Sequence, residues 1–97
     1  MKRMNKNKNF WVIAYDITDD LRRSRIVKVI EKFGERVNYS VFECMLTDSQ
    51  FKKLHDRLQT MIKPSDSIVF YPLCVGCYSK IIYTPQRYVK PLVVAVL

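Results

Sequence analysis

The sequence predicts an α+β fold, because apolar stretches of strand length alternate with two amphipathic stretches of helix length. The stretches at 10–17, 41–46 and 67–71 are nearly continuous runs of aliphatic and aromatic residues, which is typical of buried strands. A short strand beginning at Glu35 completes the order strand, helix, strand, strand, helix, strand. Two helices in this order can cover one face of an antiparallel sheet. We therefore expect a ferredoxin-like βαββαβ sandwich with additional C-terminal strands.

The first strand carries one carboxylate, Asp16, near the end of an otherwise apolar run. Ionised side chains are seldom buried without a partner, so Asp16 is expected at a solvated edge, beside a cation or at a subunit boundary. Thr18 or Asp19 is expected to cap the helix that follows, and Gly34 to end it. Its apolar stripe has helical spacing and consists of Ile26, Val29, Ile30 and Phe33.

The second helix is predicted from a capping box, in which Thr47 and Gln50 stand at the required separation. A tight turn or bulge at 38–40 precedes the strand before it, and Pro72 is expected to stop the strand after it. His55 lies at the margin of the apolar stripe, so we expect a boundary packing residue rather than a catalytic base. The stripe itself consists of Phe51, Leu54, Leu58, Met61 and Ile62.

The chain is expected to form one domain with a tail at each end. Residues 1–9 are basic and Asn-rich and are expected to be a flexible tail. Residues 10–84 are expected to form the ferredoxin-like domain, which closes with a short strand at 80–84. Residues 85–97 comprise a linker and an apolar hexapeptide, which we expect to be a strand in a dimeric assembly.

The charge balance is strongly basic, with 17 Lys and Arg against nine Asp and Glu and a net charge of +8. The basic residues concentrate in residues 1–9 and in the first predicted helix. Phosphate contacts release counterions and steer association, so a nucleic-acid partner is favoured. The alternative is that the charge serves solubility alone.

The apolar runs and the cysteines suggest a compartment. The longest apolar runs fall short of the ~20 residues needed to cross a bilayer, so no membrane association is expected. Three cysteines suit a reducing cytoplasm. Cys74 and Cys77 have redox or half-metal-site spacing, but no second Cys or His pair accompanies them. We expect them to be small packing residues around a turn at Gly76.

The first strand is apolar at both even and odd positions, so neither face of the sheet is patterned for water. Helices hide one face, and a homodimer packed sheet against sheet would hide the other. A monomer with its C-terminal tail folded back on its own sheet is the alternative. Parity places Asp16 on the dimer face, where two carboxylates repel unless a divalent ion or a shared proton intervenes. Mg²⁺ needs only one or two carboxylates and can activate water for phosphodiester cleavage.

Several short motifs occur in order at characteristic intervals. They are Tyr15-Asp-Ile17, Asp20, Arg22-Arg23, Gly34-x-Arg36-Val37 and Ser40-Val-Phe-Glu43. In this combination the sequence, over about residues 12–83, resembles the small CRISPR-associated endoribonuclease family of spacer acquisition. The resemblance implies a ferredoxin-like homodimer, a metal-dependent nuclease on RNA or duplex DNA, and a partner of the CRISPR integrase.

The resemblance also implies roles for individual residues. Asp16 would be the catalytic acid and the Mg²⁺ ligand. The residues in or beside the nucleic-acid site would be Tyr15, Arg22, Arg23, Arg25, Arg36 and Phe42. Alternatively, the two aromatic residues pack the sheet, the helix arginines form a solvated face, and Arg36 pairs with Glu35 or Glu43.

Two other functions are compatible with these features. The chain could be a non-catalytic nucleic-acid-binding adaptor dimer in spacer integration, for which charge and shape suffice. It could also be a toxin-like messenger-RNA ribonuclease of related fold.

Overall fold

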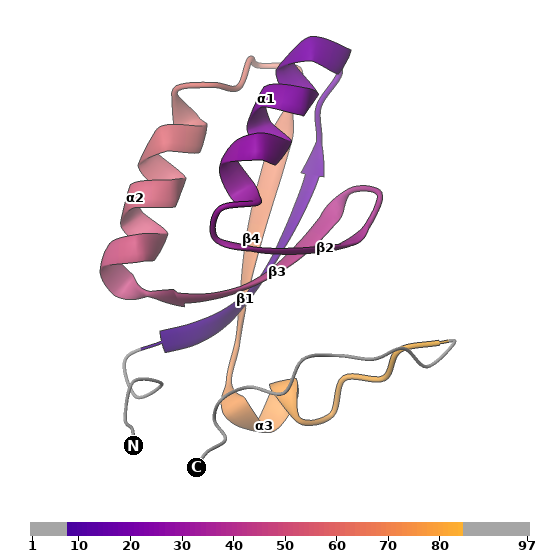
Figure 1. The fold of residues 1–97 in the computed structure, drawn as a ribbon, viewed down its shortest axis with the longest axis vertical. Coiled ribbons are helices and arrows are strands. Elements are labelled where there is room, and N and C mark those ends of the chain that lie inside the picture. Colours follow the sequence, from indigo (N-terminus) through magenta and orange to yellow (C-terminus); the bar gives the residue numbers. More distant parts are fainter. Residues whose placement is uncertain (1–7, 85–97) are drawn as a thin grey trace.

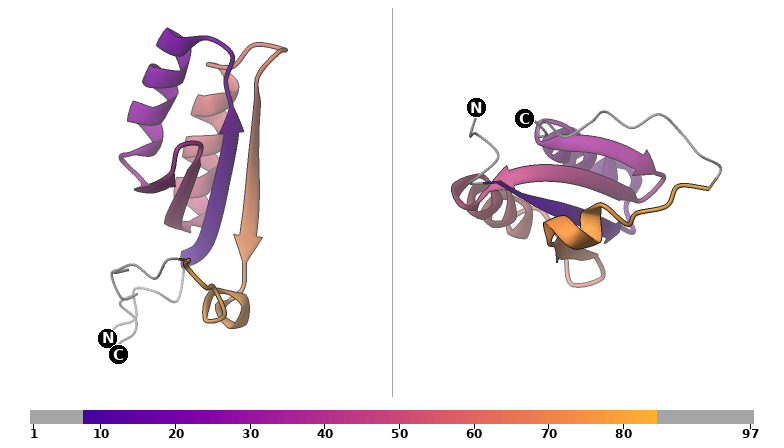
Figure 2. Two further views of the ribbon diagram at one scale, coloured as in Figure 1. Left: turned by 90° about the vertical axis from the view of Figure 1, so that its right-hand side faces the viewer. Right: turned by 90° about the horizontal axis from the view of Figure 1, so that it is seen from below.

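The computed structural model describes residues 8–84 and has the predicted βαββαβ order (Figure 1). The elements are β1 (Lys8–Asp16), α1 (Asp20–Ile30), β2 (Gly34–Asn38), β3 (Val41–Thr47), α2 (Asp48–Gln59), β4 (Ser67–Leu73) and the short α3 (Val75–Tyr78). The four strands form one antiparallel sheet in the order β2-β3-β1-β4. Helices α1 and α2 lie on the same side of this sheet (Figure 2). The ferredoxin-like α+β prediction is confirmed.

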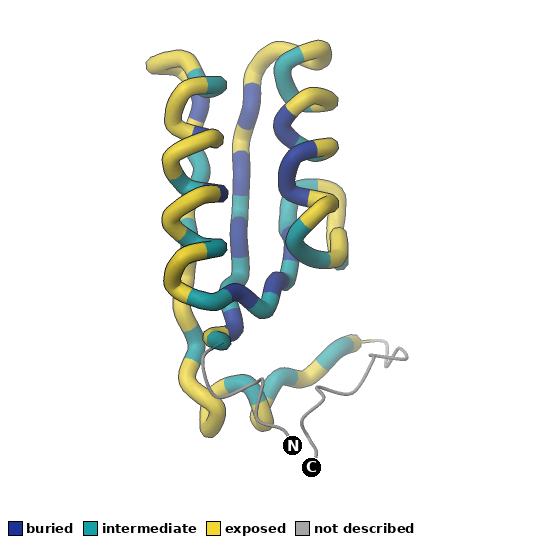
Figure 3. The backbone as a smooth tube through the Cα atoms, turned by 60° about the vertical axis from the view of Figure 1, so that its left-hand side comes forward, coloured by how far each residue is buried: buried dark blue, intermediate teal, exposed yellow. Residues whose placement is uncertain are grey.

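The core lies between the helices and one face of the sheet. Along β1 the burial alternates: Ile13 and Tyr15 are buried, whereas Ala14 is half-buried and Asp16 exposed (Figure 3). Alternate side chains of a strand point to opposite faces, so the odd-numbered residues of β1 face the helices. The helices contribute the predicted stripes, with Ile26, Val29, Ile30, Leu54 and Leu58 buried.

The predicted helix starts are confirmed. Asp19 is the N-cap of α1 and accepts a hydrogen bond from the Arg22 backbone N–H. Thr47 caps α2 through a reciprocal capping box with Gln50. His55 is half-buried and stacks on Phe51 with a centroid separation of 5.6 Å, which is the boundary position that we expected. These caps satisfy backbone N–H groups that have no partner inside a helix.

Gly34 does not end α1, contrary to our expectation. The helix ends at Ile30, and Glu31 is its C-cap. Gly34 instead opens β2 opposite Cys44, where an added Cβ would overlap the Cys44 sulfur and the Glu43 carbonyl oxygen. The glycine is needed for the close approach of β2 to β3.

Strand β4 continues through Pro72, where we had expected it to stop. Pro72 lies opposite Trp11 of β1. Because β4 is at the edge of the sheet, its outer side has no strand partner among residues 8–84. A proline, which has no N–H to donate, is tolerated in such an edge strand.

The predicted strand at 80–84 does not form within the described chain. This segment contacts the sheet face that the helices leave open, where the Tyr83 hydroxyl donates to the Glu43 carboxylate at 2.7 Å. Tyr78 packs on Phe10 of the same face, with ring centroids 4.5 Å apart. Residues 1–7 of the predicted tail and the predicted linker and strand at 85–97 lie outside the described residues.

None of the helices in residues 8–84 is both long enough and apolar enough to cross a membrane.

Lys8 and Asn9, which we assigned to the tail, begin β1.

Candidate functional site

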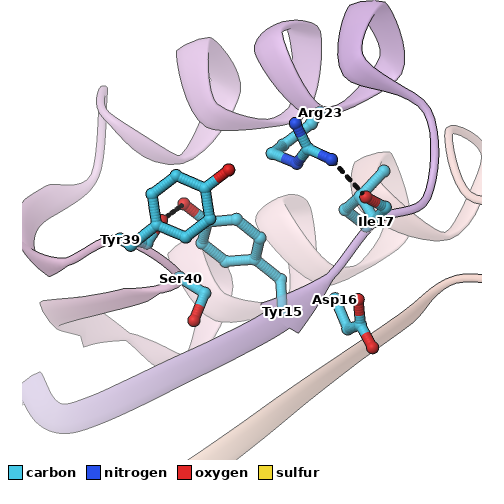
Figure 4. A pocket seen from close by; sticks show the side chains of 6 residues that line it. All are labelled: Tyr15, Asp16, Ile17, Arg23, Tyr39 and Ser40. Carbon is cyan, nitrogen blue, oxygen red and sulfur yellow. Dashed lines mark hydrogen bonds between the residues drawn. The ribbon is translucent and has the colours of Figure 1, made fainter.

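Asp16 is the last residue of β1 and lies opposite Ser67 of β4. Its neighbours Tyr15 and Ile17 are buried on the helix side, which leaves the Asp16 side chain exposed on the other side of the strand. Figure 4 shows the carboxylate pointing away from the helices. Within residues 8–84 it forms no hydrogen bond or ion pair. An exposed, unpaired carboxylate at a strand end is available to a ligand.

A pocket of about 350 Å³ lies beside this carboxylate. The end of β1, the first turn of α1 and the turn between β2 and β3 meet around it (Figure 4). Its lining residues are Tyr15, Asp16, Ile17, Arg23, Tyr39 and Ser40. The pocket therefore brings together three of the predicted site residues, which are the acid, the preceding tyrosine and one helix arginine.

Arg23 is held in place by two hydrogen bonds. Its guanidinium donates to the Asp20 carboxylate and to the Ile17 carbonyl oxygen, both at 2.8 Å. The hydrogen bond with Asp20 raises the pKa of Arg23, so this side chain is a permanent cation. Arg23 remains 25% exposed and so can contact a ligand in the pocket. A guanidinium that is held in place and still partly exposed suits the binding of a phosphate group.

The β2–β3 turn supplies an aromatic residue that the sequence analysis did not select. Tyr39 is 70% exposed and lines the pocket. Its carbonyl oxygen accepts hydrogen bonds from the Tyr15 hydroxyl and from Arg36, both at 2.8 Å. The Arg36 guanidinium also lies 5.6 Å from the centroid of the Tyr39 ring. The tight turn or bulge that we expected at 38–40 was the sequence signal that could have pointed to Tyr39, because irregular backbone often turns a side chain toward a site.

Arg22 is not part of the pocket lining and instead pairs with Asp66, a residue that the sequence analysis also missed. The Asp66 carboxylate accepts from the Arg22 guanidinium at 2.6 and 3.0 Å. It also accepts from the backbone N–H groups of Thr18, at 3.0 Å, and Lys63, at 2.9 Å. The hydrogen bonds from Arg22 hold the pKa of Asp66 well below its usual range. This network connects the chain after Asp16 to the loop before β4.

The remaining predicted residues lie outside the pocket lining. Phe42 has no exposed surface and packs near Tyr15 in the core, with ring centroids 6.0 Å apart. Arg25 is exposed on α1. Arg36 contacts the turn through Tyr39, and the described contacts include neither Glu35 nor Glu43 as its partner. Phe42 is therefore a packing residue of the sheet, which was the alternative to a role in the nucleic-acid site.

The site offers a metal ion few protein ligands. Within the described residues, no group of three or more His, Cys, Asp or Glu side chains could hold a metal ion. Mg²⁺ is commonly bound by one or two carboxylates, with waters and substrate phosphates completing its octahedron. The exposed Asp16 carboxylate fits that pattern as a single ligand.

Fold and site together define a class: a small ferredoxin-like protein with an exposed acid at the end of β1 and a fixed arginine beside it. Residues 9–81 match the family model described as CRISPR associated protein Cas2. The chain belongs to the Cas2 family, and the resemblance seen in the sequence is confirmed.

Individual relatives agree with this assignment. "CRISPR-associated endoribonuclease Cas2 3" of Synechocystis sp. is 50% identical over 64 residues, which is 65% of this chain and 70% of that protein. The crystal structure of Streptococcus pyogenes Cas2 at pH 6.5 is similar with a TM-score of 0.69 at 29% identity, covering 76% of this chain and 96% of that one. A chain of a partial Cas6-RT-Cas1--Cas2 complex has the same fold, with a TM-score of 0.72 at 24% identity over 79% of this chain and 91% of that one.

Proposed function

We propose that this protein is a CRISPR adaptation protein that acts in the cytoplasm as a Mg²⁺-dependent endonuclease and as the partner of the CRISPR integrase. The observation that carries the nuclease proposal is the exposed, unpaired Asp16 carboxylate beside a pocket that holds Arg23. Support also comes from a Cas2 relative whose name describes an endoribonuclease. The substrate class is RNA or duplex DNA.

In this proposal, Arg23 and Asp16 have separate roles. Arg23 binds a backbone phosphate, because its guanidinium is fixed by Asp20 and the Ile17 carbonyl and still reaches the pocket. Asp16 would hold Mg²⁺ from the strand end. Bound there, the ion would supply Lewis-acid stabilisation of the phosphodiester and lower the pKa of a bound water. The basic face of α1, including Arg25, attracts the polyanion over a longer range.

A homodimer would complete the assembly. The sheet face without helices carries half-buried Val12 and Ala14, and Val69 and Tyr71 are 40% and 52% exposed. Asp16 belongs to the same face by strand parity. Packing two such faces together would hide the apolar side chains and bring two Asp16 residues toward one seam. One structural neighbour comes from a complex that contains Cas1 and Cas2, which supports an integrase partner.

The decisive test compares wild type with Asp16→Asn on an RNA and a duplex DNA of matched sequence, with and without Mg²⁺. We expect the wild-type protein to cleave only with Mg²⁺ and the variant to lose at least about a hundredfold in rate, because an amide is a poorer ligand for this hard cation. Glu31→Gln is the matched control, because Glu31 is an exposed acid at the other end of α1. Equal cleavage by wild type and Asp16→Asn would refute a catalytic Asp16.

A non-catalytic adaptor is the second candidate, and the basic charge with the open sheet face supports it. In that case the wild-type protein would cleave neither substrate with Mg²⁺ or another divalent ion, while Asp16→Asn would still bind the integrase and support spacer uptake. A toxin-like ribonuclease of related fold would instead cleave messenger RNA and bind no integrase.

A further inference from the structure

Cys74 and Cys77 lie together in a part of the molecule that the proposed nuclease site does not use. They lie in the single turn formed by α3, which follows the end of β4 at the end of the sheet where β1 begins (Figure 1). Both side chains are exposed. We had expected small packing residues around a turn at Gly76: the turn is present as α3, but the two cysteines are exposed rather than packed. Exposed cysteines are reactive when they are ionised, and both thiols are accessible to a small reagent.

The backbone of α3 holds the two cysteines in a defined relation. The Cys77 backbone N–H donates to the Cys74 sulfur at 3.3 Å, and the Tyr78 N–H donates to the Cys74 carbonyl oxygen at 2.9 Å. The Cys74 sulfur therefore points toward the residue that carries the second thiol. The space over Gly76 is open: apart from its chain neighbours and the backbone of α3, a Cβ added there would have only the Cys74 sulfur, at 3.8 Å, within contact range among the described residues. A small reagent can approach this sulfur.

The two thiols also differ in acidity. The backbone N–H of Cys77 and the thiol of Cys77 both hydrogen-bond to Cys74 and lower its pKa. The same thiol–thiol hydrogen bond raises the pKa of Cys77. The third cysteine, Cys44, is in the core, where burial raises its pKa to about 12. Cys74 is thus the sulfur suited to attack, Cys77 is suited to follow it, and Cys44 is protected.

We propose that Cys74 and Cys77 form a site for thiol–disulfide exchange with a small-molecule disulfide such as oxidised glutathione. The Cys74 thiolate attacks one sulfur of the small disulfide, whose S–S bond breaks and releases one small thiol. Cys77 then loses its proton and attacks the Cys74 sulfur of the mixed disulfide, which releases the second small thiol. The protein pair loses two electrons and two protons, and the small disulfide is reduced to two thiols.

Formation of the disulfide would change the stability of the turn at α3, which contacts the open face of the sheet through Tyr78. Tyr78 belongs to the same turn and packs on Phe10 of β1. A Cys74–Cys77 bond would close a short ring around that turn and restrict its unfolding. The redox state of the pair would therefore set how firmly the chain after β4 is anchored to the sheet.

The test uses the full chain in glutathione buffers that range from fully reduced to fully oxidised, followed by acid quenching, alkylation and mass spectrometry. We expect a species lighter by two hydrogens, with residues 74 and 77 linked in one peptide and Cys44 alkylated only after denaturation. Thiols that stay reduced across the range, oxidation only to intermolecular dimers, or a tightly bound metal ion that occupies both thiols would each overturn the proposal.

Two variants test the order of the steps. Cys77→Ser should accumulate a stable mixed disulfide at Cys74, because the resolving thiol is gone. Cys74→Ser should react at Cys77 roughly tenfold more slowly than Cys77→Ser reacts at Cys74, because the backbone N–H of residue 77 still stabilises the Cys74 thiolate in the latter variant. Equal rates in the two variants would contradict Cys74 as the attacking thiol. Hydrogen exchange of residues 75–81 should slow on oxidation of the wild type and remain unchanged in both variants.

Discussion

At the scale of single residues, the candidate site combines an unpaired carboxylate, that of Asp16, with an arginine that hydrogen bonds hold in place, Arg23. The Asp16 carboxylate forms no hydrogen bond or ion pair within residues 8–84, whereas the Arg23 guanidinium is held by Asp20 and by the Ile17 carbonyl. A preorganised cation loses little freedom when it binds a phosphate. A free carboxylate keeps its lone pairs available to an incoming ion. The two residues therefore suit complementary parts of the same task.

Tyr39 gives the sharpest residue-scale prediction about substrate binding. Its ring is 70% exposed at the pocket, and Tyr15 and Arg36 fix its backbone. Base–aromatic stacking contributes about 1–3 kcal/mol per base. We expect Tyr39→Ala to weaken binding of a single-stranded RNA roughly tenfold and Tyr39→Phe to bind like wild type.

The binding is measured by fluorescence anisotropy with a labelled oligonucleotide, without Mg²⁺ so that the substrate remains intact. An oligonucleotide with an abasic site at each position in turn identifies the stacked base. If Tyr39→Ala and wild type bind with equal affinity, or if no abasic position removes the difference between them, the ring does not stack on a base.

At the scale of secondary structure elements, the network around Asp66 fixes the entrance to α1. The Asp66 carboxylate lies in the loop before β4. It accepts hydrogen bonds from Thr18, which follows the end of β1, and from Arg22 in the first turn of α1. The side chain of Asp66 has no exposed surface, and that of Arg22 is 18% exposed. The network therefore positions the turn that carries Arg23, although it lies outside the pocket lining.

We expect Asp66→Asn to lower Tm by roughly 10 °C or more, because removing one partner leaves Arg22 without its counter-charge. Asp56→Asn is the matched control, since its pair with Lys52 is exposed on both sides and its loss should change Tm by about 2 °C or less. Both changes are measured by thermal unfolding near neutral pH.

The same network predicts a pH dependence. The pKa of Asp66 is lowered in the folded chain, so its contribution to stability is complete above the ordinary carboxyl pKa of about 3.9 and is lost as the pH falls toward the folded value. The urea midpoints of wild type and Asp66→Asn should therefore converge on acidification from neutral pH to about pH 2.5. A gap that stays constant over this range would contradict an ionised Asp66 in the folded protein.

Local patterns predicted the elements well, because caps and periodic stripes act within one helix or strand. The capping box at Thr47 and the cap at Asp19 are confirmed in this way. Features that depend on distant segments were not predictable. Arg22 and Asp66 are 44 residues apart, and no local pattern links them. Gly34 was assigned to a helix end, because its contact with Cys44 exists only after β2 pairs with β3.

The candidate site was predictable to the extent that it lies on β1 and α1. Strand parity correctly separated Asp16 from the buried Tyr15 and Ile17. Tyr39 reaches the same pocket only through the fold of the β2–β3 turn, so the expected bulge marked the turn but did not show which of its side chains lines the pocket. Phe42 belongs to a motif of the resemblance, but its side chain is in the core.

At the scale of the whole molecule, the two faces of the sheet differ. One is closed by α1 and α2 (Figure 2). The other carries exposed Val69 and Tyr71, with contacts from Tyr78 and Tyr83. Both faces are apolar, so a second copy is the proposed cover for the open one. Asp16 would then lie at the subunit boundary, and the oligomeric state would control the nuclease.

This dependence gives a prediction that separates dimerisation from folding. Tyr71→Glu places a charge on the open face, on the edge strand β4, and we expect it to weaken the homodimer at least about a hundredfold, because a buried unpaired charge is costly at an interface. Leu21→Glu is the control, since Leu21 is 68% exposed on α1 rather than on the sheet. Sedimentation equilibrium measures the mass of each variant, and circular dichroism confirms that both are folded. A folded Tyr71→Glu protein that still sediments as a dimer would show that the two copies do not pack through this face, and Asp16 would then have to act from a single subunit.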